Sequence, residues 1–334
     1  MDAFVHDPLL RKQLSMLTGY VGDLEENTSA NSMIALFGYY IEGGYRPVGG
    51  TGALAQRMVE RLQQYGGEAR SLLKVESIML ENGKVNGVKT KKGNFYSTVV
   101  ISNVDPRVTY ECLVGMDHLP TAFQKKIQEL EPSMSLFVWT AAIDRPFFTD
   151  RLITYILSEP MYVPHLGVTV GKVGIHSASA LDSSLAPKGK GTITIFIPTR
   201  AEASKYSDMS MEEYTACKQE IDFICRLIIK QIDPEAERSI LFSELATPKT
   251  MQKYLQTYQG SVYNIRQQED FPEMKTPLPG LYLVGAGVGY GPGIEAVLIS
   301  GGQVAEHLKP IFSNRNQVIS TKLEGKNSYK DDRL

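Results

Sequence analysis

The stretch that decides the fold is GLYLVGAGVGYGPGIEA, residues 280–296. After Gly280 come four apolar residues, Leu281 to Val284, which are typical of a short buried strand. Five glycines follow at alternate positions, and then a segment with helical spacing that runs to about Leu308. A strand, a glycine turn and a helix in this order leave unpaired backbone N–H groups at the helix N-terminus. An anion or an electron-rich ring can bind there.

The glycines alone leave two interpretations open. They allow a ligand to approach the backbone closely, but glycine-rich turns between a strand and a helix also arise from packing. The run does not form the G-x-G-x-x-G pattern followed by an acid on a second strand. This turn is therefore a candidate ligand site only together with other features of the chain.

A second glycine-rich turn lies upstream, at residues 45–52, and reads YRPVGGTG. Apolar residues then recur at a spacing that predicts an amphipathic helix, ended by Gly66 and Gly67. Residues 72–96 predict a three-stranded antiparallel meander with a hairpin turn at Asn82-Gly83. A short apolar run at 98–102 predicts a buried strand.

The middle of the chain, from about 107 to 265, predicts an α+β domain built on an antiparallel sheet. Strands are expected at 133–143 and 191–198, where apolar residues alternate, and a long helix at 211–231, where they form one stripe. Residues 1–45 are expected to be helical. The tail after Phe312 is polar and charged, which favours disorder.

Composition excludes several classes of function. The chain has 334 residues and a net charge of −2, with no basic excess of the kind that binds nucleic acid. No signal peptide and no apolar run of about 18 residues is visible, so we expect a cytoplasmic protein or one peripheral to a membrane. The three cysteines form no C-x-x-C pair, so we expect buried free thiols and no metal site.

No familiar set of catalytic side chains stands out. The five histidines are scattered, and no G-x-S-x-G turn or Walker A motif occurs. This pattern suits an enzyme in which a cofactor supplies the chemistry while the protein binds and orients it. The catalytic residues stay unknown from the sequence.

Seven motifs, in the correct order, resemble the family of phytoene desaturases, carotenoid isomerases and retinol saturase-like proteins. Each motif is modest, but the ordered set is specific, and it covers roughly residues 3–310. The motifs lie at 45–54 (YRPVGGTGAL), 75–88, 101–106 (ISNVDP), 133–144, 182–189 (DSSLAPKG), 247–263 and 280–301.

The resemblance implies an α/β fold. An incomplete Rossmann-like FAD-binding domain of the amine-oxidase and phytoene-desaturase type would accompany an α+β substrate domain on an antiparallel sheet. The implied divisions are a helical part of the substrate region (1–45), a helix and β-meander of the FAD-binding domain (46–106), a substrate-binding domain (107–265), the closing FAD-binding strand and helix (266–312) and a polar tail (313–334).

The resemblance also implies FAD as cofactor and an oxidoreductase that acts on C–C bonds of an apolar polyene or isoprenoid-like substrate, by desaturation, saturation or isomerisation. The backbone of Val75 would meet the adenine end of FAD. The turn at Gly49 and Gly50 would lie near the cofactor and the substrate tunnel. The rest of the implied site is Gly285 and Ala286 along the ribityl-pyrophosphate, and Gly293, Ile294, Glu295 and Ala296 at the helix N-terminus under the isoalloxazine.

The chain departs from the family pattern in three places. Family members begin with a strand, a G-x-G-x-x-G turn and a helix that hold the FAD pyrophosphate, and no such segment precedes Asp7. We therefore expect a C-terminal portion, with that segment either cut off or carried by a separate N-terminal FAD-binding chain. Glu295 and Ala296 stand where the family has Pro-Gly, and Gly287 and Val288 where it has Ser-Thr.

Two other functions stay open at this point. Rab GDP-dissociation inhibitors share the implied architecture and shelter prenyl groups without redox chemistry, so a non-catalytic isoprenoid-binding module is one alternative. A related flavin amine oxidase is the other. The residues at 182–189 and 102–106 favour the desaturase branch.

Overall fold

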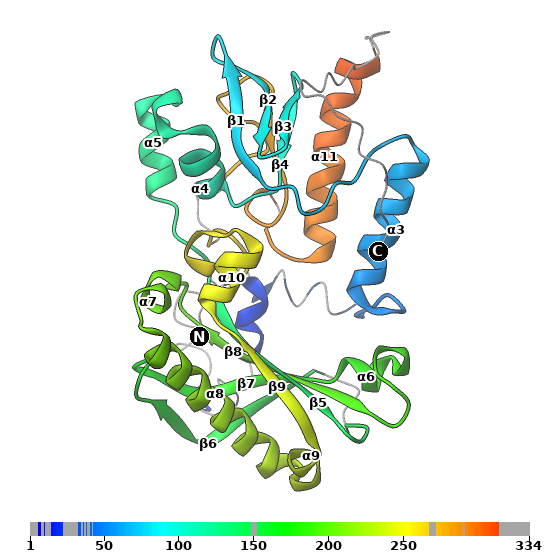
Figure 1. The fold of residues 1–334 in the computed structure, drawn as a ribbon, viewed down its shortest axis with the longest axis vertical. Coiled ribbons are helices and arrows are strands. Elements are labelled where there is room, and N and C mark those ends of the chain that lie inside the picture. Colours follow the sequence, from blue (N-terminus) through cyan, green and yellow to red (C-terminus); the bar gives the residue numbers. More distant parts are fainter. Residues whose placement is uncertain are drawn as a thin grey trace. The chain divides into compact units, whose positions relative to one another are not determined.

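The computed structural model describes residues 6–7, 10, 15–22, 33–34, 36, 38, 41, 43–147, 152–266, 272–289 and 291–313 (Figure 1). The chain divides into two compact units. Unit 1 comprises Met1–Ala69 and Pro132–Val262, and unit 2 comprises Arg70–Glu131 and Tyr263–Leu334. Most of the expected helical region 1–45 lies outside the described residues, apart from the 3-10 helix η1 (Ser15–Val21). The expected polar tail lies outside them from residue 314 onward.

The frame of unit 1 is a five-stranded antiparallel sheet with the strand order β6-β7-β8-β5-β9. The sequence predicts two of these strands, and their pairing confirms the expected antiparallel sheet. The other three interrupt their apolar alternation with glycine or charged residues. The strands are β5 (Ser135–Ile143), β6 (Ile153–Val163), β7 (Val168–His176), β8 (Gly191–Thr199) and β9 (Ile240–Ala246).

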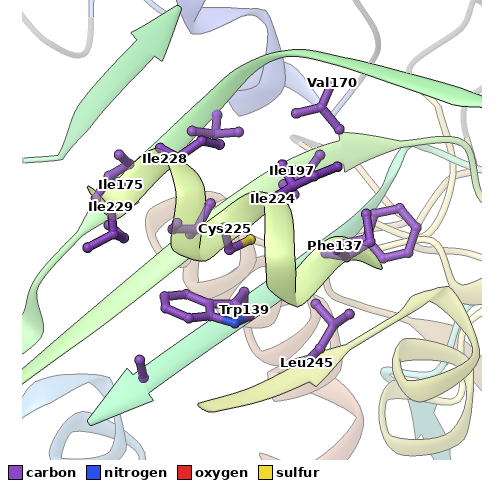
Figure 2. Packing of buried hydrophobic residues seen from close by; sticks show 14 of the residues in the cluster. Phe137, Trp139, Val170, Ile175, Ile197, Ile224, Cys225, Ile228, Ile229 and Leu245 are labelled. Atoms are coloured by element: carbon purple, nitrogen blue, oxygen red, sulfur yellow. The ribbon is translucent and has the colours of Figure 1, made fainter. Parts of the chain in front are cut away.

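Helix α8 (Met211–Ile232) covers one face of this sheet. It begins with a capping box, in which the Ser210 hydroxyl accepts a hydrogen bond from the Glu213 N–H at 3.2 Å and the Glu213 carboxylate accepts one from the Ser210 N–H at 2.8 Å. The helix confirms the predicted stripe, and Figure 2 shows its apolar side chains packed on the strands. The buried set includes Phe137, Trp139, Ile195, Ile221, Cys225 and Ile228.

A polar network joins α8 to two strands at the edge of this core. Trp139 is fully buried, and its indole Nε1 donates to Asp222 Oδ1 at 2.6 Å. Ser243 on β9 donates to the same oxygen at 2.6 Å, and Arg226 donates to Oδ2 at 2.8 Å. One carboxylate therefore satisfies donors from β5, β9 and its own helix.

The remaining helices of unit 1 are α3 (Gly50–Gln64), α6 (Ala178–Leu181), η5 (Ser183–Leu185), α7 (Ala203–Ser207), α9 (Pro234–Arg238), α10 (Pro248–Leu255) and η6 (Tyr258–Gly260).

Unit 2 contains the expected antiparallel meander of β1 (Val75–Glu81), β2 (Lys84–Thr90) and β3 (Gly93–Tyr96). Asn82 and Gly83 have φ values of 50° and 72°. Two consecutive positive φ angles in a two-residue loop define a type I′ turn, as the Asn-Gly pair predicts.

A short parallel pair, β4 (Val100–Ser102) and β10 (Leu281–Leu283), joins the two chain segments of unit 2. The expectation that the first of these strands is buried is wrong for Ile101, which is 48% exposed. The helix after the glycine turn is α11 (Ile294–Ser313). It therefore ends beyond the predicted end near Leu308.

The motif ISNVDP ends β4 and starts the helices of unit 2. The Asp105 carboxylate accepts a hydrogen bond from the Arg107 N–H at 2.9 Å, and Pro106 occupies the first helical position, where no N–H is needed. A second core forms here around Tyr110, Ile127 and Leu281. The helices are α4 (Pro106–Val108), the π-helix η3 (Thr109–Val114), η4 (Met116–His118) and α5 (Thr121–Gln128).

The cysteines follow the expectation only in part. Cys217 and Cys225 are buried free thiols on α8, but Cys112 is exposed, so the expectation of burial is wrong for that residue. Within the part of the chain that the structure describes, no helix is long and apolar enough to cross a bilayer.

Replacing Asp222 with alanine leaves the buried Trp139 N–H without its acceptor. We expect Asp222→Ala to lower the free energy of unfolding by about 1–3 kcal/mol, the range for an unsatisfied buried donor. Urea unfolding measures this. Asp144→Ala is the control, because Asp144 pairs with Lys190 with 58% of its side chain exposed. It should change stability by less than about 1 kcal/mol, and equal losses in both variants would contradict the assigned role of the network.

The same network predicts a pH dependence. Burial raises the pKa of Asp222, but hydrogen bonds from Ser243, Trp139 and Arg226 outweigh it and hold the pKa below the ordinary value of 3.8. A lowered pKa in the folded state gives stabilisation that is present above the unfolded value and lost as pH falls through the folded one. The stability difference between wild type and Asp222→Asn should therefore stay constant from pH 7 to about 5 and shrink below about 4. Unfolding curves across that range check it.

Candidate functional site

The first glycines after β10 are required by packing. Gly285 has a φ of +96°, and a Cβ atom there would lie 2.0 Å from Asn103 Oδ1. Its N–H donates to Ser300 Oγ on α11 at 3.2 Å. A Cβ on Gly287 would lie 2.5 Å from Pro106 Cδ. The close approach of β4, the turn and α11 thus explains both glycines without any ligand.

The later glycines are different. Gly289 and Gly293 have φ values of +65° and +117°, and a Cβ on either would meet nothing within 4 Å. Backbone conformation requires glycine there, while the space beside the backbone is open. These positions fit the interpretation of the glycine run in which a ligand approaches the chain.

The first turn of α11 follows this open backbone. Ile294 is 50% exposed, Glu295 is exposed and Ala296 is half-buried. Among the described residues no group accepts from the N–H donors of 294–296, so these donors at the positive end of the helix remain open to an acceptor. The Glu295 carboxylate is favourable beside this helix end but repels an anionic ligand, so an uncharged or delocalised ring suits the turn better than an isolated phosphate.

Val75 and Ala286 also belong to unit 2. Val75 begins β1 and is half-buried, and it pairs with Thr90 beside a register shift. Ile78 of the same strand shares a core with Leu281 of β10. The structure therefore brings seven of the nine expected cofactor-binding residues into one unit: Val75, Gly285, Ala286, Gly293, Ile294, Glu295 and Ala296.

Gly49 and Gly50 belong to unit 1, where they form a turn at the start of α3. The Gly49 N–H donates to Asp182 Oδ2 at 2.7 Å. Hydrogen bonds from the Ser184 hydroxyl, the Gly49 N–H and the Ser184 N–H hold the pKa of Asp182 below its ordinary value. Sequence reasoning missed this contact, because the two residues are 133 positions apart and no local pattern connects them.

A further contact on the same segment joins Arg46 to His176, the last residue of β7. Burial, and then the Arg46 charge, lower the pKa of His176, so its ring is neutral and accepts from the guanidinium. Neither residue was a candidate from the sequence. Their separation along the chain again left no local signal.

The face of the sheet opposite α8 is the second candidate region, which we call the second face. It consists of the residues that alternate with the buried set. Its central part is apolar, since Val138 on β5 pairs with Phe196 on β8. In the pairings of β8 with β5 and β7 and of β5 with β9, this set is Leu136, Val138, Thr140, Ala142, Gly174, His176, Thr192, Thr194, Phe196, Pro198, Phe242, Glu244 and Ala246.

One polar row crosses the second face. The register aligns His176, Thr194, Thr140 and Glu244 across four strands. Rows with apolar side chains flank it on both sides, with Phe196 and Val138 on one side and Ala142 and Phe242 on the other. This arrangement suits an elongated apolar ligand that meets a few polar groups along its length.

Comparison with curated proteins gives relatives that cover most of this chain. Prolycopene isomerase from Daucus carota is 30% identical over 281 residues, which are 81% of this chain and 45% of that protein. Phytoene desaturase (lycopene-forming) from Pantoea ananas is 26% identical over 315 residues, or 89% of this chain and 62% of the desaturase. In sequence the chain is thus similar to prolycopene isomerases and phytoene desaturases. No family model matches it.

Solved structures show the fold of this chain. An oxidoreductase from Methanosarcina mazei superposes with a TM-score of 0.64 at 20% identity, over 91% of this chain and 66% of that one. Putrescine oxidase superposes with a TM-score of 0.52 at 15% identity, over 79% of this chain and 53% of the oxidase. The expected α/β fold of the amine-oxidase type, with an antiparallel sheet, is confirmed. The chain spans about half the length of the prolycopene isomerases that it matches, between 45% and 47%.

The packing role of Gly285 makes a prediction that does not depend on any ligand. Gly285→Ala should lower the free energy of unfolding by about 3 kcal/mol or more, because the positive φ and the Asn103 contact both oppose a methyl group. Gly301→Ala on α11 is the matched control, since a Cβ there meets nothing within 4 Å. It should raise stability by about 0.5–1 kcal/mol by favouring helix. Chemical denaturation of both variants checks the pair, and equal effects would refute the packing role.

Proposed function

We propose that the chain forms part of an FAD-dependent oxidoreductase that acts on C–C bonds of an apolar polyene or isoprenoid-like substrate, by desaturation, saturation or isomerisation. The observation that carries this proposal is the homology to proteins named as a prolycopene isomerase and a phytoene desaturase, over 81% and 89% of the chain. A 4,4'-diaponeurosporene oxygenase from Staphylococcus aureus matches 92% of it at 23% identity. These relatives favour neither the prenyl-binding module nor an amine oxidase.

The turn before α11 supports FAD as the cofactor. The open space beside Gly289 and Gly293 lets a flat ring approach the backbone, and the helix N-terminus behind them stabilises negative charge on it. When bound, FAD supplies two-electron redox chemistry. The chain itself binds and orients the reactants. For Gly285 and Ala286 the proposed role is backbone contact, because packing already fills the side-chain space at Gly285.

The second face supports an apolar, elongated substrate. Phe196 and Val138 lie at its centre, and Phe242 on the edge strand is 61% exposed. The four strands that contribute to the second face span about 14 Å at the usual strand spacing of nearly 5 Å, so a rod-like polyene could lie across them. Such a substrate would run parallel to the polar row and alongside the apolar side chains of Phe196 and Val138.

The chain covers only part of the length of its relatives, which concerns both FAD binding and turnover of the substrate. Because it matches 45% of the carrot isomerase, we propose that FAD binding and turnover are properties of the whole protein. Further residues would then contribute to the site, either in the same polypeptide or as a separate FAD-binding chain.

The cofactor proposal is tested by titrating FAD with the chain and with its longest natural form while following flavin fluorescence. We expect quenching on binding, and a loss of affinity of about tenfold or more in Gly293→Ala, since a methyl group at φ +117° distorts the turn. Gly301→Ala is again the control and should leave affinity unchanged. Failure of every wild-type form to take up flavin would refute the cofactor proposal.

The substrate proposal is tested with a conjugated polyene hydrocarbon. Trp139 is the single tryptophan of the chain, so energy transfer from it to a bound polyene reports binding. Phe242→Ser should weaken binding by about three- to tenfold through loss of apolar contact. Phe223→Ser is the control, because Phe223 is 66% exposed on α8, which covers the other face. Equal weakening in both variants would place the substrate elsewhere.

A further inference from the structure

We propose that Asp182 is a positioning residue, which holds the turn at residues 47–50 in one form and thereby sets the direction of the Val48–Gly49 peptide. The contacts that carry this inference all lie within unit 1. The relevance of this turn to FAD binding rests on the proposed function, whereas the control of the turn by Asp182 does not.

Glycine at position 49 allows the turn two backbone forms. The Gly50 N–H donates to the Pro47 carbonyl at 3.1 Å, which closes a four-residue β-turn. Gly49, its third residue, has φ 82° and ψ 8°, while Val48 is not among the residues with positive φ. These angles define a type II turn. Since glycine also tolerates the type I angles at this position, rotation of the Val48–Gly49 peptide alone converts one form into the other.

Asp182 selects between these two forms through the rotated peptide. Its Oδ2 atom accepts the Gly49 N–H at 2.7 Å, a charge-assisted hydrogen bond that exists only while this N–H points toward the carboxylate. In the other form the carbonyl oxygen of Val48 would turn toward the carboxylate, where like partial charges repel. The carboxylate therefore favours type II by attraction and disfavours type I by repulsion.

The carboxylate is fixed independently of the turn. Its other oxygen, Oδ1, accepts from the Ser184 hydroxyl at 2.6 Å and from the Ser184 N–H at 3.0 Å. The side chain of Leu185 lies 3.6 Å from the Cβ position of Gly50, so the same short segment also contacts the next residue of the turn. At its other end the turn is tied to the sheet through Arg46 and His176. Ser184 thus holds the carboxylate of Asp182 in place, and the contact between Arg46 and His176 holds the adjacent turn.

The consequence concerns the opposite side of the peptide. With its N–H held by Asp182, the peptide directs the Val48 carbonyl oxygen away from the carboxylate. Val48 is 89% exposed, and among the described residues no donor reaches this carbonyl. The turn thus presents an oriented backbone acceptor, suited to an N–H or O–H group of a ligand such as a flavin ring or a sugar hydroxyl.

Amide hydrogen exchange of the full chain, followed by mass spectrometry on a peptide covering 45–53, tests the inference. We expect Asp182→Ala to speed exchange at Gly49 by about tenfold or more, since hydrogen bonds to charged acceptors shift equilibria by at least that factor. Asp182→Asn should give a smaller increase, because its amide oxygen still accepts. Asp144→Ala, which removes another exposed carboxylate of the same unit, should leave the peptide unchanged.

Protection of the β8 peptide, residues 191–199, reports whether each variant remains folded. Unchanged exchange at 45–53 in folded Asp182→Ala overturns the inference. If that variant loses protection in β8 as well, Ser184→Ala decides instead: faster exchange at 45–53 with β8 intact supports the role of Asp182, and no change refutes it.

Flavin titration of the same variants separates this inference from the proposed function. Weaker FAD binding by Asp182→Ala, with faster exchange, links the turn to the cofactor. Faster exchange with unchanged flavin affinity keeps Asp182 as the residue that positions the turn and removes Gly49 and Gly50 from the cofactor site. No flavin uptake by any wild-type form refutes the cofactor alone.

Discussion

Unit 1 depends on the burial of one face of its five-stranded sheet under helix α8. Side chains alternate along every strand, so once Phe137, Trp139 and Ile143 point into this core, their neighbours must point the other way. The register therefore creates the second face as a direct result of core packing. A slip of one residue would exchange the two faces and destroy both the core and the proposed substrate surface.

The Asp222 network strengthens this constraint at the edge strand. Among the strands that the structure describes, β9 pairs only with β5, so these backbone hydrogen bonds secure it on one side alone. Ser243 and Trp139 both donate to Asp222, which ties β9 and β5 to the same turn of α8. Glu244 and Phe242, which extend the second face to its edge, depend on that attachment for their placement.

Much of the local structure could be predicted from the sequence, because the responsible residues are neighbours in the chain. Asn82-Gly83 specifies its own turn, and Ser210 with Glu213 marks the start of α8. The strands β6 and β7 could not be predicted, because Glu159 and Pro160 interrupt the apolar alternation of β6, and Gly171 and Gly174 that of β7. Asp182 and His176 contact their partners only after folding, so no spacing in the sequence indicates them. The cofactor roles of the expected site residues stay predictions.

The glycines after β10 also affect how related sequences should be interpreted. Asn103 and Pro106 occupy the space that side chains at Gly285 and Gly287 would need, so a relative that has lost its cofactor would still retain both glycines. Retention of the strand and its first glycines therefore records only that β4, β10 and α11 still pack together. Evolutionary loss of flavin binding would first become visible at Gly289 and Gly293, where open space leaves side-chain volume unconstrained and backbone conformation alone opposes change.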